Sequence, residues 1–141
     1  MDIFITIFCL SLMIFVHELG HLFAAKWGGI GVLEFSLGMG PKLFGFRFGE
    51  TVYNFRLILV GGYVRLAGLD DASEQLDSNT FFQNRPLFKR IITILAGSFM
   101  NVVMGFIIFF SIVLFLGVSE TSSRVESVLD GSPAFESGLK K

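Results

Sequence analysis

Two long apolar stretches dominate the chain, and a segment with a different periodicity separates them. The first stretch runs over residues 3–27, and the second over 91–118, where no residue is charged. About 20 predominantly apolar residues are enough for an α-helix to cross the hydrocarbon core of a bilayer. We therefore predict a transmembrane helix over each stretch, with a cytoplasmic loop over 70–90 leading into the second one.

The segment over 30–69 alternates with a period of two, which is typical of β-strands. Gly49-Glu50 interrupts the alternation and suits a two-residue type II′ turn. This turn fixes a register that pairs Phe48 with Thr51, Phe46 with Tyr53 and Phe44 with Phe55. Further strand is expected over 57–60 and 63–66, split by Gly61 and Gly62. We predict a membrane-associated β-hairpin region between the two helices.

The hydrophilic end of the chain, residues 119–141, predicts a strand over 124–129 and a helix that starts after Gly131-Ser132-Pro133. The fold class expected for the whole is an α-helical membrane protein. No basic residue precedes the first apolar stretch and no small-x-small cleavage site follows it. We therefore interpret that stretch as a retained membrane helix rather than a signal peptide.

Composition supports this class and excludes others. Hydrophobic residues make up 52% of the chain, and only 16% are charged, below the roughly 25% of soluble domains. The formal net charge of −1 provides no field that would attract nucleic acid, so we expect no nucleic-acid partner. The bilayer itself is the first expected partner.

The candidate chemistry lies inside the first apolar stretch, at His17-Glu18-Leu19-Gly20-His21. Histidines four residues apart lie on one face of a helix, where two imidazoles can hold one zinc ion with the glutamate beside it as a base. Ionisable groups at membrane depth are costly and usually mark a function. The bland alternative is a hydrogen-bonded pair of buried histidines, which the membrane setting disfavours. We predict Zn²⁺ as cofactor, His17 and His21 as ligands and Glu18 as the catalytic residue.

Basic residues predict the orientation. Lys and Arg are concentrated between the two apolar stretches, whereas only Asp2 precedes the first one. The positive-inside rule then places the central loop in the cytoplasm and both flanking ends outside.

At this point four motifs, in order, resemble those of the site-2 proteases, and within them the bacterial regulator-of-sigma-E type. They are the His17–His21 motif, the glycine-rich stretches 35–43 and 61–68, the stretch 96–101, and the stretch 128–139 that resembles the start of a PDZ domain. The family usually has proline where this chain has Ser98. The resemblance implies an intramembrane zinc endopeptidase of a bacterial inner membrane, with an extracytoplasmic PDZ domain that begins within 119–141.

The resemblance also implies partners and substrate contacts. Substrates would be single-span membrane proteins such as anti-sigma factors, cut within their transmembrane segments during stress-response signalling. The β-region would steer the substrate, and Asn101 would match an asparagine linked to substrate handling. Gly97, Gly61 and Gly62 are the other expected substrate-binding residues.

One part of the family pattern is not found in these 141 residues. The third metal ligand of the family is an aspartate in a later span, and Asp130 imitates its Leu-Asp-Gly context without the preceding Asn and Pro. We expect this chain to be the N-terminal portion of a longer protein. The alternative is a non-catalytic membrane scaffold, or an inactive fragment, that binds substrate helices without cutting them.

Overall fold

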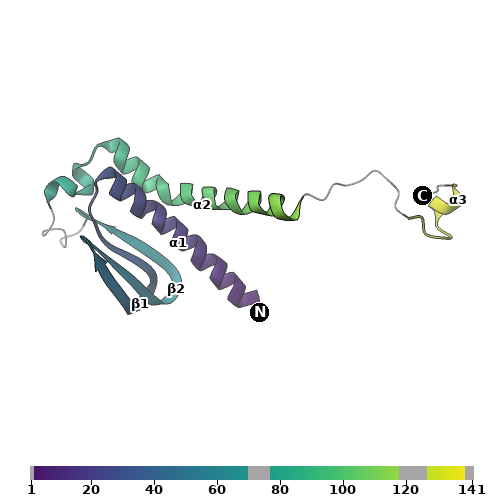
Figure 1. Cartoon of the computed structure of the whole chain (residues 1–141), viewed down its shortest axis with the longest axis horizontal. Coiled ribbons are helices and arrows are strands. Elements are labelled where there is room, and N and C mark those ends of the chain that lie inside the picture. The colour runs from purple at the N-terminus through teal and green to yellow at the C-terminus, as the bar shows by residue number, and fades with distance from the viewer. Residues whose placement is uncertain (1, 70–76, 118–126, 139–141) are drawn as a thin grey trace. The chain divides into compact units, whose positions relative to one another are not determined.

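The computed structural model describes residues 2–69, 77–117 and 127–138. It contains two units, Met1–Ile108 and Phe109–Lys141. The helix α1 covers Asp2–Gly28, the strands β1 and β2 cover Val32–Phe48 and Thr51–Leu66, and the helix α2 covers Leu87–Leu116. The two strands form an antiparallel sheet against α1, as Figure 1 shows. The two helices and the hairpin were all expected from the pattern of the sequence.

The helix α2 exposes apolar side chains along nearly its whole length. The helix α1 does so over residues 2–13, and from residue 14 onward most of its side chains are buried or partly buried. The mean hydropathy of the most apolar window is 2.1 in α1 and 2.6 in α2, and 6% and 0% of these windows is buried. A helix that is apolar on all sides and is not buried by protein is explained by contact with lipid. Their lengths of 27 and 30 residues suffice to cross a membrane.

The observed helix α2 begins at Leu87, four residues before the predicted start. The carbonyl of Pro86 accepts hydrogen bonds from the N–H groups of Lys89 and Arg90, which starts the helix. The apolar stretch marks only the part of the helix that suits lipid, whereas Pro86 in the sequence fits the first turn of the helix. Lysine and arginine are good helix formers and occupy the first turn at little cost.

The sheet follows the predicted hairpin register, since Phe48 pairs with Thr51, Phe46 with Tyr53 and Phe44 with Phe55. Gly49 has a φ of +63°, while no described non-glycine residue has a positive φ. A type I′ turn would need a positive φ at Glu50 as well, so the backbone favours the expected type II′ turn.

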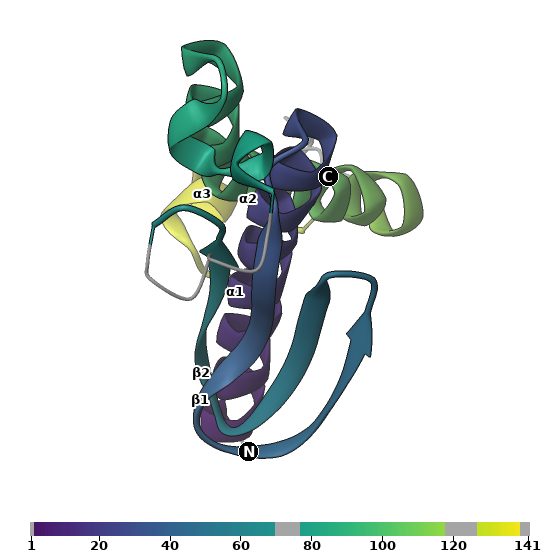
Figure 2. The same ribbon diagram turned by 90° about the vertical axis from the view of Figure 1, so that its left-hand side faces the viewer.

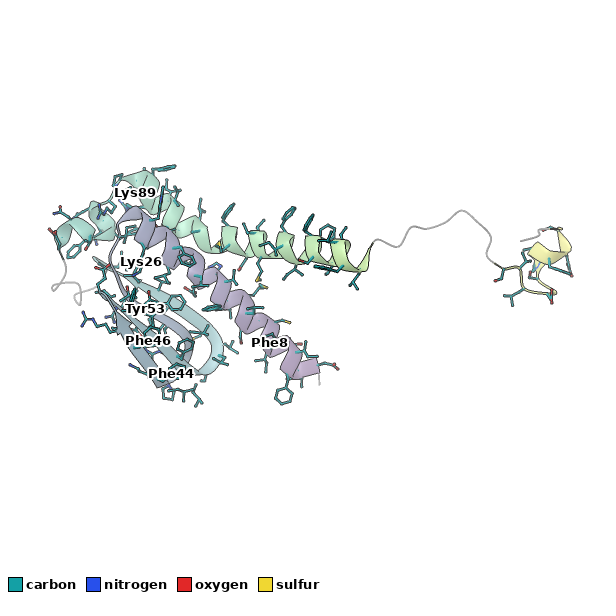
Figure 3. All side chains as sticks on the ribbon, viewed as in Figure 1. Phe8, Lys26, Phe44, Phe46, Tyr53 and Lys89 are labelled. Atoms are coloured by element: carbon teal, nitrogen blue, oxygen red, sulfur yellow. The ribbon has the colours of Figure 1, made fainter. Side chains whose placement is uncertain are left out.

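Aromatic pairs hold this end of the hairpin together. The rings of Phe44 and Phe55 stack with centroids 4.6 Å apart, and those of Phe46 and Tyr53 stack at 5.2 Å. Such cross-strand pairs stabilise a hairpin by up to about 1 kcal/mol each. Figure 3 labels Phe44, Phe46 and Tyr53 on the strands that lie beside α1.

Both strands bend back on themselves, as Figure 2 shows, which the sequence did not predict. As a result the start of β1 has two partner segments. Residues Glu34–Leu37 pair with Gly62–Arg65 on one side and with Val52–Phe55 on the other. The expected break at Gly61 and Gly62 is wrong, because β2 continues through both. Gly61 absorbs the irregularity with a φ of +110°, which other residues rarely adopt.

The core of the first unit joins α1, the sheet and the segment before α2. Its buried members are Leu22, Ala25, Ile30, Val32, Phe35 and Phe82. Phe82 belongs to η3 (Phe82–Asn84), which follows η2 (Ser78–Thr80). The surface loop predicted over 70–90 is therefore only partly correct, because an aromatic anchor from it is buried. The acidic residues Asp70, Asp71 and Glu74 lie outside the described residues.

In the second unit the helix α3 covers Pro133–Glu136. The hydroxyl of Ser132 caps it by accepting a hydrogen bond from the N–H of Phe135 at 3.3 Å. A helix start after Gly131-Ser132-Pro133 is thus confirmed. Of the strand predicted over 124–129, residues 127–129 are described and form no strand. The beginning of a PDZ domain remains a prediction.

Candidate metal centre

The two histidines of α1 direct their ring nitrogens to one point. The Nε2 atoms of His17 and His21 lie 3.1 Å apart, and the rings meet edge to face with centroids 4.8 Å apart. Spacing of four residues on a helix produces this juxtaposition. Glu18 follows His17 directly, so the three side chains of the sequence motif lie within one turn.

One face of α2 closes over the imidazoles. Thr93, Gly97 and Asn101 follow each other at intervals of four. The carbonyl oxygen of Thr93 lies 2.7 Å from His21 Nδ1, and Asn101 Nδ2 lies 3.2 Å from His17 Nδ1. Both histidines are therefore held at Nδ1 by the neighbouring helix.

Gly97 gives the imidazoles their space. A Cβ atom there would overlap Nε2 of His21 and would lie 2.6 Å from Nε2 of His17. Gly20 similarly allows α1 and α2 to touch, because a Cβ there would overlap the carbonyl of Ala96. A Cβ at Gly105, by contrast, would meet nothing within 4 Å among the described residues.

A cavity of about 430 Å³ opens beside the motif. Its lining includes Glu18, His21, Gly62, Tyr63 and Thr93. Gly62 brings the edge of the sheet close to α1, because a Cβ at this position would lie 3.0 Å from Glu18 Cγ. The catalytic candidate Glu18 therefore faces a space large enough for part of a peptide, with a strand edge beside it.

The four residues predicted to bind substrate lie in different surroundings. Gly62 lines the cavity with Glu18. Gly61 packs against the side chain of Met39. Gly97 lies against both imidazoles and Asn101 against His17 alone. Their contact with a substrate stays a prediction for all four.

A polar network stabilises the bent sheet next to the cavity. Glu34 Oε1 accepts hydrogen bonds from Asn54 Nδ2 at 2.6 Å, Arg56 Nη2 at 2.9 Å and Tyr63 Oη at 2.6 Å. Arg56 also donates to Ser36 Oγ at 2.8 Å and to the carbonyl of Gly40 at 2.9 Å. Four segments of the bent hairpin are thereby joined around one carboxylate.

The network changes the acidity of its members. Burial raises the pKa of Glu34, but the hydrogen bonds from Tyr63, Asn54 and Arg56 outweigh it, and the net pKa lies below the ordinary 4.5. Burial, followed by the hydrogen bond to Glu34, raises the pKa of Tyr63 above its ordinary value. At neutral pH Glu34 is therefore a carboxylate and Tyr63 a phenol, which are the forms that the network requires.

The donor set of the motif fits a divalent metal. A carbonyl oxygen can only accept, so His21 Nδ1 carries the proton and donates a hydrogen bond to the main-chain carbonyl of Thr93. The lone pair of His21 is then on Nε2, beside Nε2 of His17. A neutral imidazole with a free Nε2 lone pair is a good zinc ligand, and a catalytic zinc takes three protein ligands. Within residues 2–69, 77–117 and 127–138, no group of three His, Cys, Asp or Glu side chains lies close enough to hold a metal.

Sequence reasoning missed Thr93 as a part of this site. Its contribution is a main-chain oxygen, which no side-chain motif reveals. The available signal was the spacing of Thr93, Gly97 and Asn101, since three such residues on one face of an apolar helix indicate a close helix neighbour.

Comparison with known proteins agrees with the geometry of the motif. Residues 5–141 match peptidase family M50, and the chain belongs to this family. The resemblance to the site-2 proteases is thereby confirmed.

The curated relatives come from several bacteria. A Clostridium perfringens protein, named as a candidate zinc metalloprotease, is 43% identical over the whole chain, which covers 41% of that relative. A Thermotoga maritima protein with a similar name is 34% identical over 96% of the chain and 27% of the relative. The zinc metalloprotease RasP of Shouchella clausii is 31% identical, over 97% of the chain and 50% of its own length. The chain thus spans between about a quarter and a half of these relatives.

Proposed function

We propose that this chain carries the zinc-binding motif and part of the substrate path of an intramembrane endopeptidase. One observation supports this above the others. On a helix long and apolar enough to cross a membrane, two imidazole Nε2 atoms converge to 3.1 Å with a glutamate beside them. Membership in peptidase family M50 and the names of the relatives support the same chemistry.

In this proposal His17 and His21 bind zinc and Glu18 acts as the base. When bound, zinc acts as a Lewis acid and makes hydroxide available near neutral pH. Glu18 takes the proton of the attacking water and delivers it to the nitrogen of the leaving amine. The third ligand would come from sequence outside the described residues.

The strand edge beside Glu18 suggests how the substrate is presented. A transmembrane helix resists attack because its carbonyls are engaged in hydrogen bonds within the helix. In an extended segment added to the edge of β2 at Gly62, the carbonyls that face the sheet would pair with it, and those that face away would be free next to Glu18. Asn101 and Gly61 would contact the same segment farther along.

The position of the hairpin along α1 supports presentation of the substrate by the edge of β2. The hydroxyl oxygen of Ser11 lies 2.8 Å from the carbonyl oxygen of Leu59 in β2 and 2.8 Å from that of Ile7 in α1, so the two carbonyls share its one hydrogen. Ser11 precedes His17 by six residues, or about 9 Å along a helix axis. Part of the hairpin therefore lies alongside the membrane-crossing part of α1, and its exposed apolar residues, such as Leu57 and Ile58, would contact lipid.

Location, orientation and partners extend the proposal. We place the protein in the inner membrane of a bacterium, with residues 70–90 in the cytoplasm and a PDZ domain beginning outside within 119–141. Its substrates would be single-span membrane regulators of the anti-sigma type. The grouping of Lys26 and Lys89, labelled in Figure 3 at the neighbouring ends of α1 and α2, supports this orientation.

The test is substitution of the base. Glu18→Gln, in the protein expressed with any sequence that follows residue 141 in its gene, should lower cleavage of a single-span reporter by about 10²–10⁴-fold. The matched control Glu50→Gln changes an exposed carboxylate in the hairpin turn and should cleave normally. Undiminished cleavage by the Glu18→Gln protein, at normal membrane insertion, would contradict the proposal.

A scaffold that binds transmembrane segments without cutting them is the second candidate. The observation that favours it is the lack of a third ligand among the residues that the structure describes. It predicts that the 141-residue chain co-purifies with a substrate segment that stays intact. Chelator-sensitive cleavage by that chain alone would exclude it.

A further inference from the structure

The two histidines have different kinds of hydrogen-bond partner on α2. His21 Nδ1 meets a main-chain carbonyl, whose role as an acceptor is fixed. His17 Nδ1 meets the side-chain amide of Asn101, whose nitrogen donates and whose oxygen accepts. The tautomer of His21 is thus set by the backbone, whereas that of His17 depends on which end of the amide faces it.

To bind zinc through Nε2, His17 must carry its proton on Nδ1. With Asn101 Nδ2 donating to Nδ1, the proton of His17 lies on Nε2 and points to His21 Nε2, 3.1 Å away. That arrangement satisfies the histidine pair in the absence of a metal. It also removes the lone pair with which His17 would bind zinc.

The other end of the amide is available for the exchange. Asn101 Oδ1 is buried and has no hydrogen-bond partner among the described residues. A half-turn about the Cβ–Cγ bond would bring Oδ1 to the place of Nδ2, at hydrogen-bond distance from His17 Nδ1. His17 would then donate from Nδ1, and both Nε2 lone pairs would face the same point.

We propose that Asn101 is a positioning residue for the metal centre, whose amide oxygen accepts the Nδ1 proton of His17 and so fixes the tautomer that binds zinc. This inference rests on the proposed zinc site. It means that α2 affects the affinity for zinc through the side chain of Asn101. Partners of this kind orient metal-binding histidines, and their loss typically weakens metal binding 10–100-fold.

The same arrangement leaves the amide nitrogen of Asn101 without a partner among the described residues. It would occupy the buried place that Oδ1 holds in the structure.

The experiment compares the unchanged protein with three variants purified in detergent, each with any sequence that follows residue 141 in its gene. Zinc per protein is measured after dialysis against graded concentrations of a chelator. Asn101→Leu keeps the approximate volume but has no acceptor, and should lose zinc at about 10–100-fold lower chelator concentration than the unchanged protein. Asn101→Asp keeps an acceptor and should retain zinc nearly as well as the unchanged protein. Ser98→Ala, an exposed position on the same helix, is the control.

The aspartate variant separates positioning from mere packing between helices. A structural role of the amide as donor would be lost equally in Asn101→Asp and Asn101→Leu. Equal zinc loss in both variants, or full retention in Asn101→Leu, would overturn the inference. If Asn101→Leu does not fold, the Asn101→Asp variant decides: retention of zinc supports the inference, and loss of zinc overturns it. Absence of zinc from the unchanged protein would instead contradict the proposed function.

Discussion

Gly97 is the residue at which α2 and both imidazoles meet. A side-chain carbon added at this position would lie within 2.8 Å of ring atoms of both His17 and His21. Its small size, rather than any conformational freedom, explains its place, because it lies in the regular helix α2. Asn101, one turn later on α2, provides the side-chain amide that contacts His17.

We predict that Gly97→Ala displaces the imidazoles. Overpacking of this kind typically destabilises a protein by about 1–3 kcal/mol. The variant should show a lower Tm in detergent and lower zinc content. Gly105→Ala is the matched control, since its methyl group would meet no described atom within 4 Å. That substitution should be neutral or stabilising, because alanine favours a helix by about 0.5–1 kcal/mol over glycine. Equal behaviour of the two variants would contradict this account of the site.

At the scale of elements, the bent hairpin depends on the carboxylate of Glu34. The side chain is 12% exposed and collects three hydrogen bonds from β2. Bending brings these donors together from positions separated along the strand. The network therefore links the shape of the sheet to the position of Gly62 at the cavity.

Stability should depend on pH through Glu34. Its pKa is lower in the folded state than the ordinary 4.5, so its contribution is complete above that pH and is lost as the pH falls through the folded pKa. We predict that Glu34→Gln lowers the Tm at pH 7 and that the difference from the unchanged protein narrows below pH 4.5. Thermal unfolding in detergent at a series of pH values measures both. A difference that stays constant down to about pH 3 would refute the role of the charge, and Glu50→Gln should show no such difference at any pH.

At the scale of the whole molecule, membrane topology decides where the metal centre lies. His17 is in the second half of α1, and the basic residues lie beyond the end of that helix or in its last turn. If the central loop is cytoplasmic, the histidines lie toward the cytoplasmic half of the membrane. Under the proposed function, a substrate would then be cut near its cytoplasmic end.

Labelling of single cysteines tests this orientation. Cys9 is the only cysteine, so Cys9→Ala provides a background without thiols. In spheroplasts, a membrane-impermeant maleimide should label Glu136→Cys, and should label Ser78→Cys only after lysis. The reverse pattern would show that the orientation is inverted.

The sequence by itself determined the elements and the local register. Apolar length predicted both helices, and the turn at Gly49 predicted the hairpin pairs residue by residue, because both depend on neighbours close in the chain. It also supplied the motif from His17 to His21, since helical periodicity alone puts those side chains on one face. The bend of the strands and the burial of Phe82 were not predictable in this way.

Only the tertiary structure decided what surrounds the motif. The contacts of His21 with Thr93 and of His17 with Asn101 join residues 72 and 84 positions apart. The network around Glu34 likewise needs the sheet to fold back before its donors converge. Such contacts depend on how packed elements exclude one another and satisfy buried polar groups, and periodicity along a single element carries no information about that.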